Sequence, residues 1–497
     1  MRYDPPRFLP AGDSALLVEF GDEVDLGLNA RVHALAQALR ALRMPGVGEA
    51  VPSYRSLLLH YDPGCLTYAE VLAAGQDALA QAQAAVPGEP RVVEVPVCYG
   101  GEFGPDLDFV ARHNRLSPRD VIQLHSSGLY PVYMLGFSPG FPYLGGLDPS
   151  IATPRLASPR TEVSAGSVGI AGEQTGIYPI ATPGGWQLIG RTPLRLFDPW
   201  RRSPALLRPG DRVRFVPMEP GNYDDLWNRE WATGEPARHS APGSRIPSLE
   251  VVQPGLLTTV QDLGRLGHEA VGVPVAGAMD TFALKAANQL VGNSSDTAGL
   301  EITIAGPTLR AMADCLIAVG GADLGLHING QPIPPWMSAY VRRGWQIDFR
   351  GQRSGCRAYL AVAGGIDVPP VLGSRSTYLR GGFGGQEGRA LKAGDVLLVA
   401  QDLGRGHLPA RAARELSRDP AQLRSLLPPY SDEPTVAVIP GPQSEAFSAA
   451  GIEAYNGSQY QVSPTADRMG YRLQGPTIAH HGPDPLPTAD IVSDCIA

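Results

Sequence analysis

Three aromatic side chains that could line a ligand site stand in one glycine-rich stretch of the sequence. Phe137, Phe141 and Tyr143 lie within Gly-Phe-Ser-Pro-Gly-Phe-Pro-Tyr-Leu-Gly-Gly, between turn-forming glycines and prolines. Such rings make a rigid apolar wall, and glycine lets the backbone approach a ligand closely. The stretch therefore predicts a wall for a small ligand. The alternative interpretation is that the rings fill the core between turns.

The same stretch contains the letters of a serine-hydrolase nucleophile elbow, Gly-x-Ser-x-Gly, with Ser138 at its centre. In that elbow, the residue after the serine donates its backbone N–H to the oxyanion. Here that residue is Pro139, which has no backbone N–H. The sequence therefore argues against a serine hydrolase.

A second stretch, Thr-Pro-Gly-Gly-Trp-Gln-Leu-Ile-Gly-Arg, combines groups that suit an anion. Gly184 and Gly185 can present backbone N–H groups to it. Arg191 supplies a guanidinium fork that matches a carboxylate or a phosphate, so we expect Arg191→Ala to abolish activity without unfolding the protein. Gln174 and Trp186, in the same part of the sequence, are predicted to contact the substrate as well.

The second half of the chain repeats the combination of glycine, acid and arginine. Asp262 and Arg265 share the run Gln-Asp-Leu-Gly-Arg, and Asp280 precedes a predicted helix. Asp280 is most simply the cap of that helix, although a helix N-terminus also attracts anionic ligands. Arg375 lies in Gly-Ser-Arg-Ser-Thr and Arg468 in Asp-Arg-Met-Gly-Tyr-Arg. These five are the candidate site residues of the second half.

Composition argues against several functions. Only two of the 41 basic residues are lysines, Lys285 and Lys392, and both lie in Leu-Lys-Ala, so the sequence shows neither a P-loop nor a biotin-bearing lysine. A net charge of −8 without a basic run argues against nucleic acid as a partner. Five scattered cysteines indicate neither a zinc site nor a disulfide framework. No run approaches the ~18 apolar residues of a membrane span, and a cytoplasmic location is expected. Because the charge argues against nucleic acid, the expected ligand is a small molecule.

The fold is predicted to be α+β and mostly β. The 59 glycines and 48 prolines among 497 residues favour short strands and tight loops over long helices. Strands are expected at 14–20 and 56–61, and helices near 28–42 and 68–85. A short helix is expected after a cap at Ser117, with Pro118 at its first position. The predicted parts are a small α/β subdomain (1–88), a barrel (89–217), a linker (218–248), a first barrel subdomain of the second half (249–400), a connecting segment (401–433) and an incomplete second barrel subdomain (434–497).

Taken together, the motifs resemble a known family. Leu-Gly-Phe-Ser-Pro-Gly-Phe-Pro-Tyr-Leu and Pro-Gly-Gly-Trp-Gln-Leu-Ile-Gly-Arg-Thr-Pro are similar to the B subunit of 5-oxoprolinase, which overlaps the sporulation-kinase-inhibitor proteins. Gln-Pro-Gly-Leu-Leu-Thr-Thr-Val-Gln-Asp-Leu-Gly-Arg, Gly-Ala-Met-Asp and Gly-Ser-Arg-Ser-Thr resemble the C subunit of the same enzyme. The pair also resembles allophanate hydrolase subunits 1 and 2 and the carboxyltransferase region of urea carboxylase. The resemblance covers nearly the whole chain, as a fusion of the B and C subunits.

This resemblance implies cyclophilin-like β-barrel subdomains and an ATP-dependent opening of 5-oxo-L-proline to L-glutamate, together with the separate A subunit of 5-oxoprolinase. The lactam resists simple hydrolysis, and phosphorylation of its amide oxygen would create a leaving group that water can displace. Such a route uses ATP and Mg²⁺, with arginines on the phosphates. The candidate cationic groups are Arg191, Arg265, Arg375 and Arg468, and the candidate metal ligands, without a firm assignment, are Asp262 and Asp280.

Two departures from the family pattern raise further expectations. Glu173 stands where the family usually has a small residue, so a carboxylate is expected in the pocket wall. There it either alters the charge preference for a ligand or simply faces solvent. The sequence stops soon after Asp-Ile-Val-Ser-Asp, where relatives of the C-terminal half continue, so the last barrel is expected to be incomplete.

Two other functions stay open. One is a carboxyltransferase that acts with a separate biotin carrier, as in a urea carboxylase system. The other is a binding protein that inhibits a histidine kinase through its first half. The sequence also leaves open a homo-oligomer, the role of Glu173 and which half binds ATP.

Overall fold

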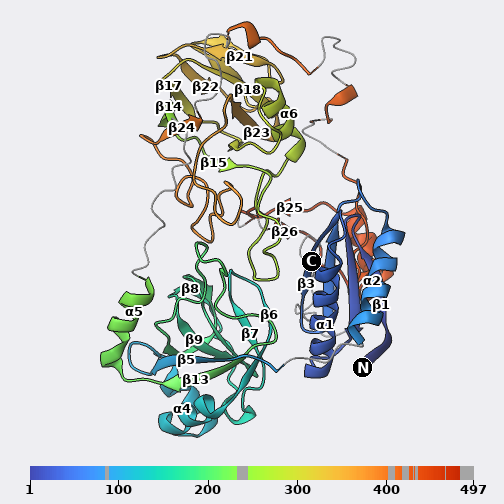
Figure 1. Ribbon diagram of the computed structural model, residues 1–497, viewed down its shortest axis with the longest axis vertical. Coiled ribbons are helices and arrows are strands. Elements are labelled where there is room, and N and C mark those ends of the chain that lie inside the picture. Colours follow the sequence, from blue (N-terminus) through green and yellow to red (C-terminus); the bar gives the residue numbers. More distant parts are fainter. Residues whose placement is uncertain are drawn as a thin grey trace. The chain divides into compact units, whose positions relative to one another are not determined.

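The fold is that of a computed structural model of the chain (Figure 1). The structure describes residues 1–83, 89–231, 245–400, 409–416, 425–428, 430, 435–464, 466–468 and 470–481. The chain divides into two compact units, one of Met1–Arg91 with Ala437–Ala497 and one of Val92–Val436. None of the helices in the described ranges is long and apolar enough to cross a membrane.

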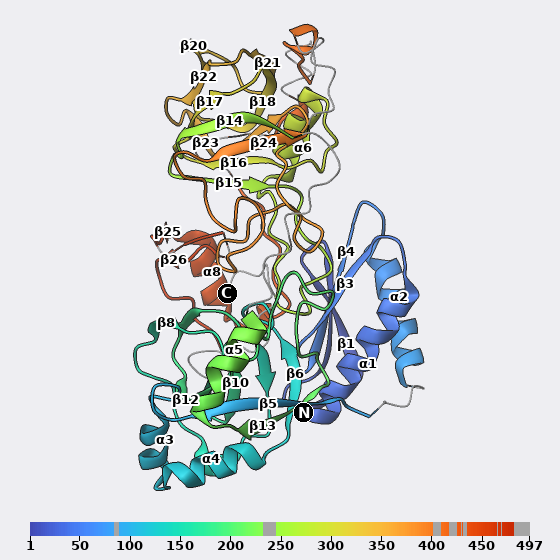
Figure 2. The same ribbon diagram turned by 60° about the vertical axis from the view of Figure 1, so that its left-hand side comes forward.

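The N-terminal part of the first unit is a four-stranded antiparallel sheet with two helices. In spatial order its strands are β1 (Arg2–Ala11), β2 (Ala15–Gly21), β4 (Ser56–Tyr61) and β3 (Val47–Pro52). Helices α1 (Leu26–Leu42) and α2 (Tyr68–Gln83) pack side by side on one face of the sheet (Figures 1 and 2). The side chains buried between the layers include Val32 and Leu35 of α1, Val71 of α2 and Leu16 and Val18 of β2.

The sequence predicted two of the four strands of this sheet and both of its helices, and it missed β1 and β3. The strands expected at 14–20 and 56–61 and both expected helices are confirmed, while residues 84–88 lie outside the described ranges. Strand β1 was missed because Pro5, Pro6 and Pro10 argue against a strand. It lies at the edge of the sheet, where a residue without a backbone N–H is tolerated because one side of the strand has no partner.

The C-terminal segment of the first unit differs from the barrel predicted for 434–497. Its described elements are the 3₁₀ turn η5 (Ser444–Ala446), helix α8 (Ala449–Gly457) and the two-residue strands β25 (Gln461–Val462) and β26 (Leu473–Gln474). Val438, Ile439 and Val462 are more than half exposed. Strand pairing over two residues with exposed apolar side chains gives no barrel core in this described segment.

Residues 92–217 form a closed seven-stranded barrel, as the prediction for 89–217 expected. In order around the barrel the strands are β10 (Gln174–Ile177), β7 (Pro142–Leu144), β6 (Tyr130–Leu135), β13 (Arg212–Pro217), β5 (Val92–Tyr99), β12 (Gln187–Arg191) and β9 (Ser167–Ala171). Strand β13 runs parallel to β5 and antiparallel to β6. A separate pair, β8 (Arg160–Val163) with β11 (Thr182–Gly184), and the 3₁₀ turn η1 (Pro149–Ile151) lie in the barrel loops.

Helices α3 (Leu107–Asn114), α4 (Pro118–Ser127) and α5 (Tyr223–Trp231) accompany the barrel. Helix α4 begins with the predicted cap at Ser117, whose side chain accepts from the Asp120 N–H. Helix α5, preceded by the 3₁₀ turn η2 (Pro220–Asn222), shows that the described first part of the predicted linker 218–248 is helical. Tyr223, Trp227 and Trp231 recur every four residues and stack along one face, a helical spacing hidden among charged residues.

A histidine lies in the barrel core. His125 of α4 is fully buried and stacks on Phe215 of β13, with ring centroids 4.4 Å apart. The Tyr99 hydroxyl lies 2.8 Å from Nδ1, and the Thr175 hydroxyl lies 2.8 Å from Nε2. Because the Thr175 hydroxyl donates to the Gly169 carbonyl, it accepts from Nε2–H, which leaves Nδ1 to accept from Tyr99. Burial lowers the pKa of His125 to about 3, so the imidazole stays neutral.

The second half of the larger unit is built from two sheets that enclose one core (Figure 2). The six-stranded sheet is, in order, β20 (Gln331–Pro332), β19 (Leu326–Ile328), β22 (Gln346–Phe349), β17 (Thr308–Ala311), β14 (Arg245–Gln253) and β24 (Val396–Ala400). The five-stranded sheet is β15 (Leu257–Gln261), β16 (Gly299–Thr303), β23 (Ser354–Val362), β18 (Cys315–Asp323) and β21 (Ser338–Val341). Only the first half therefore has a closed barrel among the described sheets.

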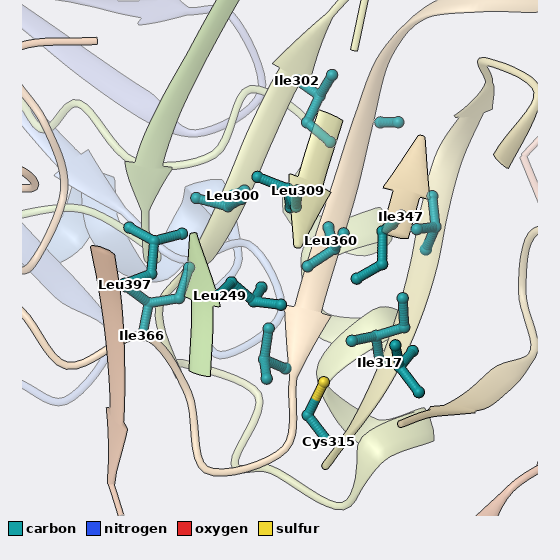
Figure 3. Packing of buried hydrophobic residues seen from close by; sticks show 14 of the residues in the cluster. Leu249, Leu300, Ile302, Leu309, Cys315, Ile317, Ile347, Leu360, Ile366 and Leu397 are labelled. Atoms are coloured by element: carbon teal, nitrogen blue, oxygen red, sulfur yellow. The ribbon is translucent and has the colours of Figure 1, made fainter. Parts of the chain in front are cut away.

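Alternation along the strands explains this arrangement. Ile317 and Val319 of β18 point into the core between the sheets, where Leu249, Leu309 and Leu360 lie (Figure 3). Leu316 and Ala318, the alternate residues of β18, face the opposite way and pack against α6 (Thr281–Val291), the helix predicted after Asp280. Each side chain fully buried in such a core contributes ~1.5–3 kcal/mol, so the paired sheets are a rigid base for the loops that leave them. The 3₁₀ turn η4 (Pro409–Arg411) follows beside β21.

The buried His125 predicts an acid-sensitive barrel. Below pH ~6.5 the unfolded chain takes up a proton at this residue, whereas the folded barrel resists protonation down to a pKa of about 3. Stability should therefore fall by a few kcal/mol as the pH is lowered through this window. His125→Gln, which cannot titrate, should show a flatter fall in melting temperature between pH 6.5 and pH 4. Parallel curves for wild type and variant would contradict the assignment, and the exposed His113→Gln is the control.

Candidate functional site

The aromatic residues predicted as a ligand wall do form one cluster. Phe141 lies at its centre, with its ring edge-to-face against Tyr143, Tyr178 and Trp186 at centroid distances of 5.3, 5.5 and 5.7 Å. Phe141, Tyr178 and Trp186 are buried, and Tyr143 is partly buried. The cluster therefore supports the core-filling interpretation for most rings. Phe137, the remaining member, differs.

Phe137 projects from the cluster into solvent on a strained turn. Its side chain is 58% exposed, and its φ of +65° is unusual for a residue with a bulky side chain. The Ser138 N–H donates to the Gly136 carbonyl over 2.7 Å, which closes a three-residue turn around Phe137. Positive-φ turns of this kind are rare and strained, and such strain is concentrated at functional sites. Phe137 is thus the part of the aromatic wall that a ligand can reach.

The second predicted stretch lies against the same rings. Trp186 itself belongs to the cluster, and a Cβ at Gly184 would collide with the Tyr178 hydroxyl, so only glycine fits there. The Gly185 carbonyl accepts from the Leu156 N–H. Gln174 is partly buried on β10, and Glu173 beside it is exposed to solvent.

An ion pair holds this stretch in place. Asp106 accepts from Arg160 Nη2 at 2.8 and 2.9 Å and from the Leu188 N–H at 2.7 Å. Arg160 also donates from Nη1 to the Trp186 carbonyl at 3.3 Å. The pair therefore positions β12 and the ring of Trp186. Asp106 and Arg160 were not among the predicted site residues because they are 54 positions apart in sequence, and nothing in the sequence signals that they pair.

Arg191 lies in a structural setting. Its Nε donates to the Ala165 carbonyl at 3.0 Å, and its guanidinium stacks over the Trp227 ring of α5 at 5.5 Å. These contacts connect β12 to a helix in the segment that was predicted to be a linker. The described contacts do not bring Arg191 to the Phe141 cluster, and its role as a cationic donor remains a prediction.

The loops of the two halves of the larger unit meet directly. Leu135 forms a parallel bridge with Val271, and the Gly140 N–H donates to the Val271 carbonyl at 2.8 Å. Phe197 of the barrel packs with Val273 and Phe383 of the second half, at a ring distance of 5.8 Å between the two phenylalanines. We call this region the junction, comprising residues 135–141 and 197 of the barrel and 262–278 and 374–388 of the second half.

Asp262 organises the second-half side of the junction. Its Oδ1 accepts from the hydroxyls of Ser374 and Ser376 at 2.6 and 2.5 Å and from the Gly264 N–H at 2.8 Å. Its Oδ2 accepts from the Arg375 N–H at 2.5 Å. Four donors thus converge on a single buried carboxylate. Three of the four donors come from Gly-Ser-Arg-Ser, so the contact between Asp262 and that motif is made by its backbone and hydroxyls.

Arg265 is the most unusual residue of the junction. It is 1% exposed, and its Nη2 donates to the Ser376 carbonyl. Its Nε and Nη1 have no hydrogen-bond partner among the described residues, although the guanidinium lies over the Phe383 ring at 5.2 Å. Burial lowers the pKa of Arg265 to about 10, and the negative charge of Asp262 opposes that shift, so the side chain stays charged at neutral pH.

Asp280 acts as the helix cap that the simpler interpretation predicted. Its Oδ1 accepts from the Ala283 N–H at 2.9 Å, and its Oδ2 accepts from the Tyr430 hydroxyl at 2.6 Å. The Asp280 N–H donates to the hydroxyl of Tyr359, which in turn donates to the buried Glu301. Burial is the main cause that raises the pKa values of Tyr359 and Tyr430, so both hydroxyls remain protonated donors.

The remaining predicted residues are not brought to Arg265 by the described contacts. The Arg375 Nε donates to the Val368 carbonyl at 3.0 Å and its Nη2 lies 3.6 Å from Asp367. Arg468 belongs to the other unit. The structure therefore brings Asp262, Arg265 and the Arg375 backbone close to one another. Ser138 was not among the predicted site residues, although the Gly-x-Ser-x-Gly pattern marks it in the sequence. Its hydroxyl is buried and has no partner in the described chain.

The candidate metal ligands do not fit Mg²⁺, which binds through free carboxylate oxygens and retained waters. Both oxygens of Asp262 and both oxygens of Asp280 already accept bonds from protein donors. Among the residues that the structure describes, no group of three or more His, Cys, Asp or Glu could hold a metal ion.

Both halves of the chain match known protein families. The family model described as carboxyltransferase domain, subdomain C and D, matches residues 6–207, and the model for subdomain A and B matches residues 271–497. The B subunit of 5-oxoprolinase from Bacillus subtilis (strain 168) is 49% identical over 222 residues, which cover 43% of this chain and 92% of that protein. The C subunit of 5-oxoprolinase from Escherichia coli (strain K12) is 37% identical over 227 residues, which cover 46% of this chain and 68% of that protein.

One solved structure matches nearly the whole chain. The crystal structure of TTHA0988 aligns with a TM-score of 0.75 and 38% sequence identity, covering 93% of this chain and 86% of that one. The arrangement of both halves in one polypeptide is therefore found in a second protein.

The clamp on Asp262 predicts a large loss of stability when its charge is removed. Asp262→Asn would turn one acceptor oxygen into a donor and leave buried N–H or O–H groups unpaired, which costs ~2–4 kcal/mol. Chemical denaturation should detect the loss in the second half. Asp296→Asn, at an exposed carboxylate bonded to Ser294, is the matched control and should change stability by less than ~0.5 kcal/mol. Equal midpoints for the two variants would contradict the clamp.

The turn at Phe137 predicts an unusual order of stability. Both Phe137→Gly and Phe137→Ala remove the ring, but glycine tolerates a positive φ without steric cost. The glycine variant should therefore be more stable than the alanine variant by ~1 kcal/mol. The measurement is the difference in unfolding free energy. A more stable alanine variant would show that the turn carries no strain.

Proposed function

The chain belongs to the family of the 5-oxoprolinase B and C subunits, and from this premise we propose that it unites both of them in one polypeptide. With the separate A subunit of that enzyme, it opens 5-oxo-L-proline to L-glutamate and hydrolyses ATP, in the cytoplasm. The observation that carries this proposal is the tandem match of two family models, whose relatives include separately named B and C subunits.

The geometry of the larger unit supports a site for a small amide. Phe137 offers an exposed ring beside a rigid aromatic cluster, which suits the flat face of a five-membered lactam. Arg265 offers buried positive charge beside the same junction, and positive charge stabilises an anionic group of a substrate. These residues bind and orient; the water that completes ring opening is assigned to no residue of this chain.

ATP supplies the phosphoryl group that activates the lactam oxygen, and Mg²⁺ would accompany it. Because the oxygens of Asp262 and Asp280 are occupied by protein donors, no step of this chain is derived through the metal. The requirement for the A subunit of 5-oxoprolinase follows from the names of the relatives, which are subunits of a larger enzyme.

A second candidate function is a carboxyltransferase that works with a separate biotin carrier. The observation that favours it is the description of both matching family models as carboxyltransferase subdomains. Since both lysines of the chain lie in Leu-Lys-Ala, biotin would arrive on another protein.

Reconstitution decides between the two functions. We expect the purified chain, mixed with a matching A subunit of 5-oxoprolinase, to form glutamate and ADP from 5-oxo-L-proline and ATP, and neither protein alone to do so. Glutamate and ADP should appear in a one-to-one ratio, measured by chromatography. The control replaces 5-oxo-L-proline with urea in the presence of a biotin carboxylase and its carrier. Turnover in that system, without glutamate formation in the first, would reject the oxoprolinase and establish the carboxyltransferase.

A further inference from the structure

Arg265 is a buried cation with most of its hydrogen-bonding capacity unused. A guanidinium has five N–H donors, of which Nε carries one and Nη1 carries two. In Arg265 these three have no partner in the part of the chain that the structure describes, and the residue is 1% exposed. The large majority of buried polar groups in folded proteins have a hydrogen-bond partner, so three unpaired N–H donors on one side chain need an explanation.

Neighbouring acids do not compensate this charge. Arg265 forms no ion pair within 4.0 Å in the described residues, where such pairs are found for many other arginines. Asp262, three positions earlier, turns its oxygens to Ser374, Ser376 and two backbone N–H groups. Its charge reaches Arg265 only through space.

A purely structural role does not account for the arginine either. Its contacts are one bond to the Ser376 carbonyl and the stacking over Phe383. A neutral side chain of similar length would fill the same volume without the desolvation penalty of a buried ion, which is large. Residues that lower the stability of the folded protein are typical of functional sites.

The cover over Arg265 is built so that the backbone lies directly on the guanidinium. A Cβ at Gly384 would lie 2.8 Å from Arg265 Nη2 and would collide with the Ser376 carbonyl oxygen. Gly382, Gly384 and Gly385 all adopt positive φ, and Leu379 at the start of this loop is 41% exposed. In the loop 379–388 the part that covers Arg265 is therefore backbone, together with the ring of Phe383. Because Arg265 is 1% exposed, a ligand would reach its guanidinium only with this part of the loop moved aside.

The surroundings of Arg265 favour a monoanion with an apolar body. The apolar cluster around this part of the junction consists of Phe383, Tyr378, Val371, Val273 and Phe197. The junction also contains Arg380 and Arg375, and the Arg375 side chain is engaged by the Val368 carbonyl and Asp367. The single charge of Arg265 balances one negative charge, whereas a phosphate ester or a polyphosphate needs several cations or a metal. Both lysines of the chain lie elsewhere in the sequence, at positions 285 and 392. A carboxylate accepts a fork of two parallel N–H bonds from a guanidinium.

Ser138 supplies a second unpaired polar group at the junction. Its hydroxyl is buried without a partner among the described residues, and its carbonyl oxygen would lie 2.7 Å from a Cβ at Gly272 of the second half. Gly140, two residues later, packs against Phe197, the ring that contacts Phe383. A hydroxyl both donates and accepts, so it suits an amide.

We propose that Arg265 binds the carboxylate of a small cyclic amide acid at the junction, beneath the loop 379–388. This assignment rests on the proposed function, because it takes 5-oxo-L-proline as the amide acid. It makes the fused chain itself the carrier of the substrate site, independent of ATP.

Direct binding to the purified full chain, without ATP or any other protein, tests the assignment. Calorimetric titration compares 5-oxo-L-proline with 2-pyrrolidinone, which has the same lactam ring but no carboxylate. We expect 5-oxo-L-proline to bind wild type at least about tenfold more tightly than Arg265→Met, with Arg265→Lys between them, since lysine keeps the charge but loses the fork. 2-Pyrrolidinone should bind all three equally weakly. Arg342→Met, at an exposed arginine stacked on Trp345, is the matched control and should bind like wild type.

The melting temperature separates a binding role from a structural one. Arg265→Met removes an uncompensated buried charge, so its melting temperature should equal or exceed that of wild type. A fall of more than about 5 °C would mark Arg265 as a structural residue and overturn the assignment. Adding 5-oxo-L-proline should raise the melting temperature of wild type and leave that of Arg265→Met unchanged.

Three binding outcomes overturn the assignment. The first is equal affinity of wild type and Arg265→Met for 5-oxo-L-proline. The second is no binding to wild type at concentrations on the order of 10 mM, the weak end of ligand affinity. The third is binding of inorganic phosphate that is lost in Arg265→Met. In each case glutamate formation in the reconstituted enzyme reports separately on the proposed function, so failure of the carboxylate site and failure of the oxoprolinase are distinguished.

Discussion

The four-donor clamp on Asp262 is the interaction on which the junction of the larger unit depends. One carboxylate holds the end of β15, the turn at Gly264 and the hydroxyls of Ser374 and Ser376 in a fixed relation. A buried carboxylate with four donors is stable because each donor replaces a lost contact with water. The carboxylate whose charge acts on Arg265 through space is thus hydrogen-bonded to other groups. A single acid therefore stabilises the loops and leaves the neighbouring cation without a direct acidic partner among the described residues.

Glycine allows these loops to lie so close together. At Gly384 the backbone touches both Arg265 and the Ser376 carbonyl, and no side chain fits between them. At Gly272 the backbone of the second half reaches the Ser138 carbonyl of the barrel. The abundance of glycine, which first indicates only turns, here has a second consequence, because close backbone contact joins the two halves.

The sequence predicts the regular elements of this protein better than its site. Periodicity and capping identify α1, α2, α4 and α6, because each helix has a local pattern of apolar residues and a cap. Helix α5 escapes because its stacking residues, Tyr223, Trp227 and Trp231, are surrounded by charged residues. Strand β1 escapes because its prolines are tolerated only at an edge, and edge position is a property of the whole sheet.

The site is harder to predict from the sequence than the helices and strands, because the roles of its charged residues depend on partners far apart in sequence. The motifs suggest Asp262, Arg265 and Arg375 as candidates together with Asp280 and Arg468. They cannot tell which of these is satisfied by the protein, since the donors to Asp262 include residues 112 to 114 positions away. The motifs suggest Arg191 as strongly as Arg265, yet one stacks on Trp227 and bonds the Ala165 carbonyl, and the other is buried with Nε and Nη1 unpaired within the described chain. Whether an arginine is available to a ligand is decided by the carbonyls and acids that the fold brings to it, and this is why we propose Arg265, whose motif is no more distinctive than the others, as the residue that receives a substrate anion.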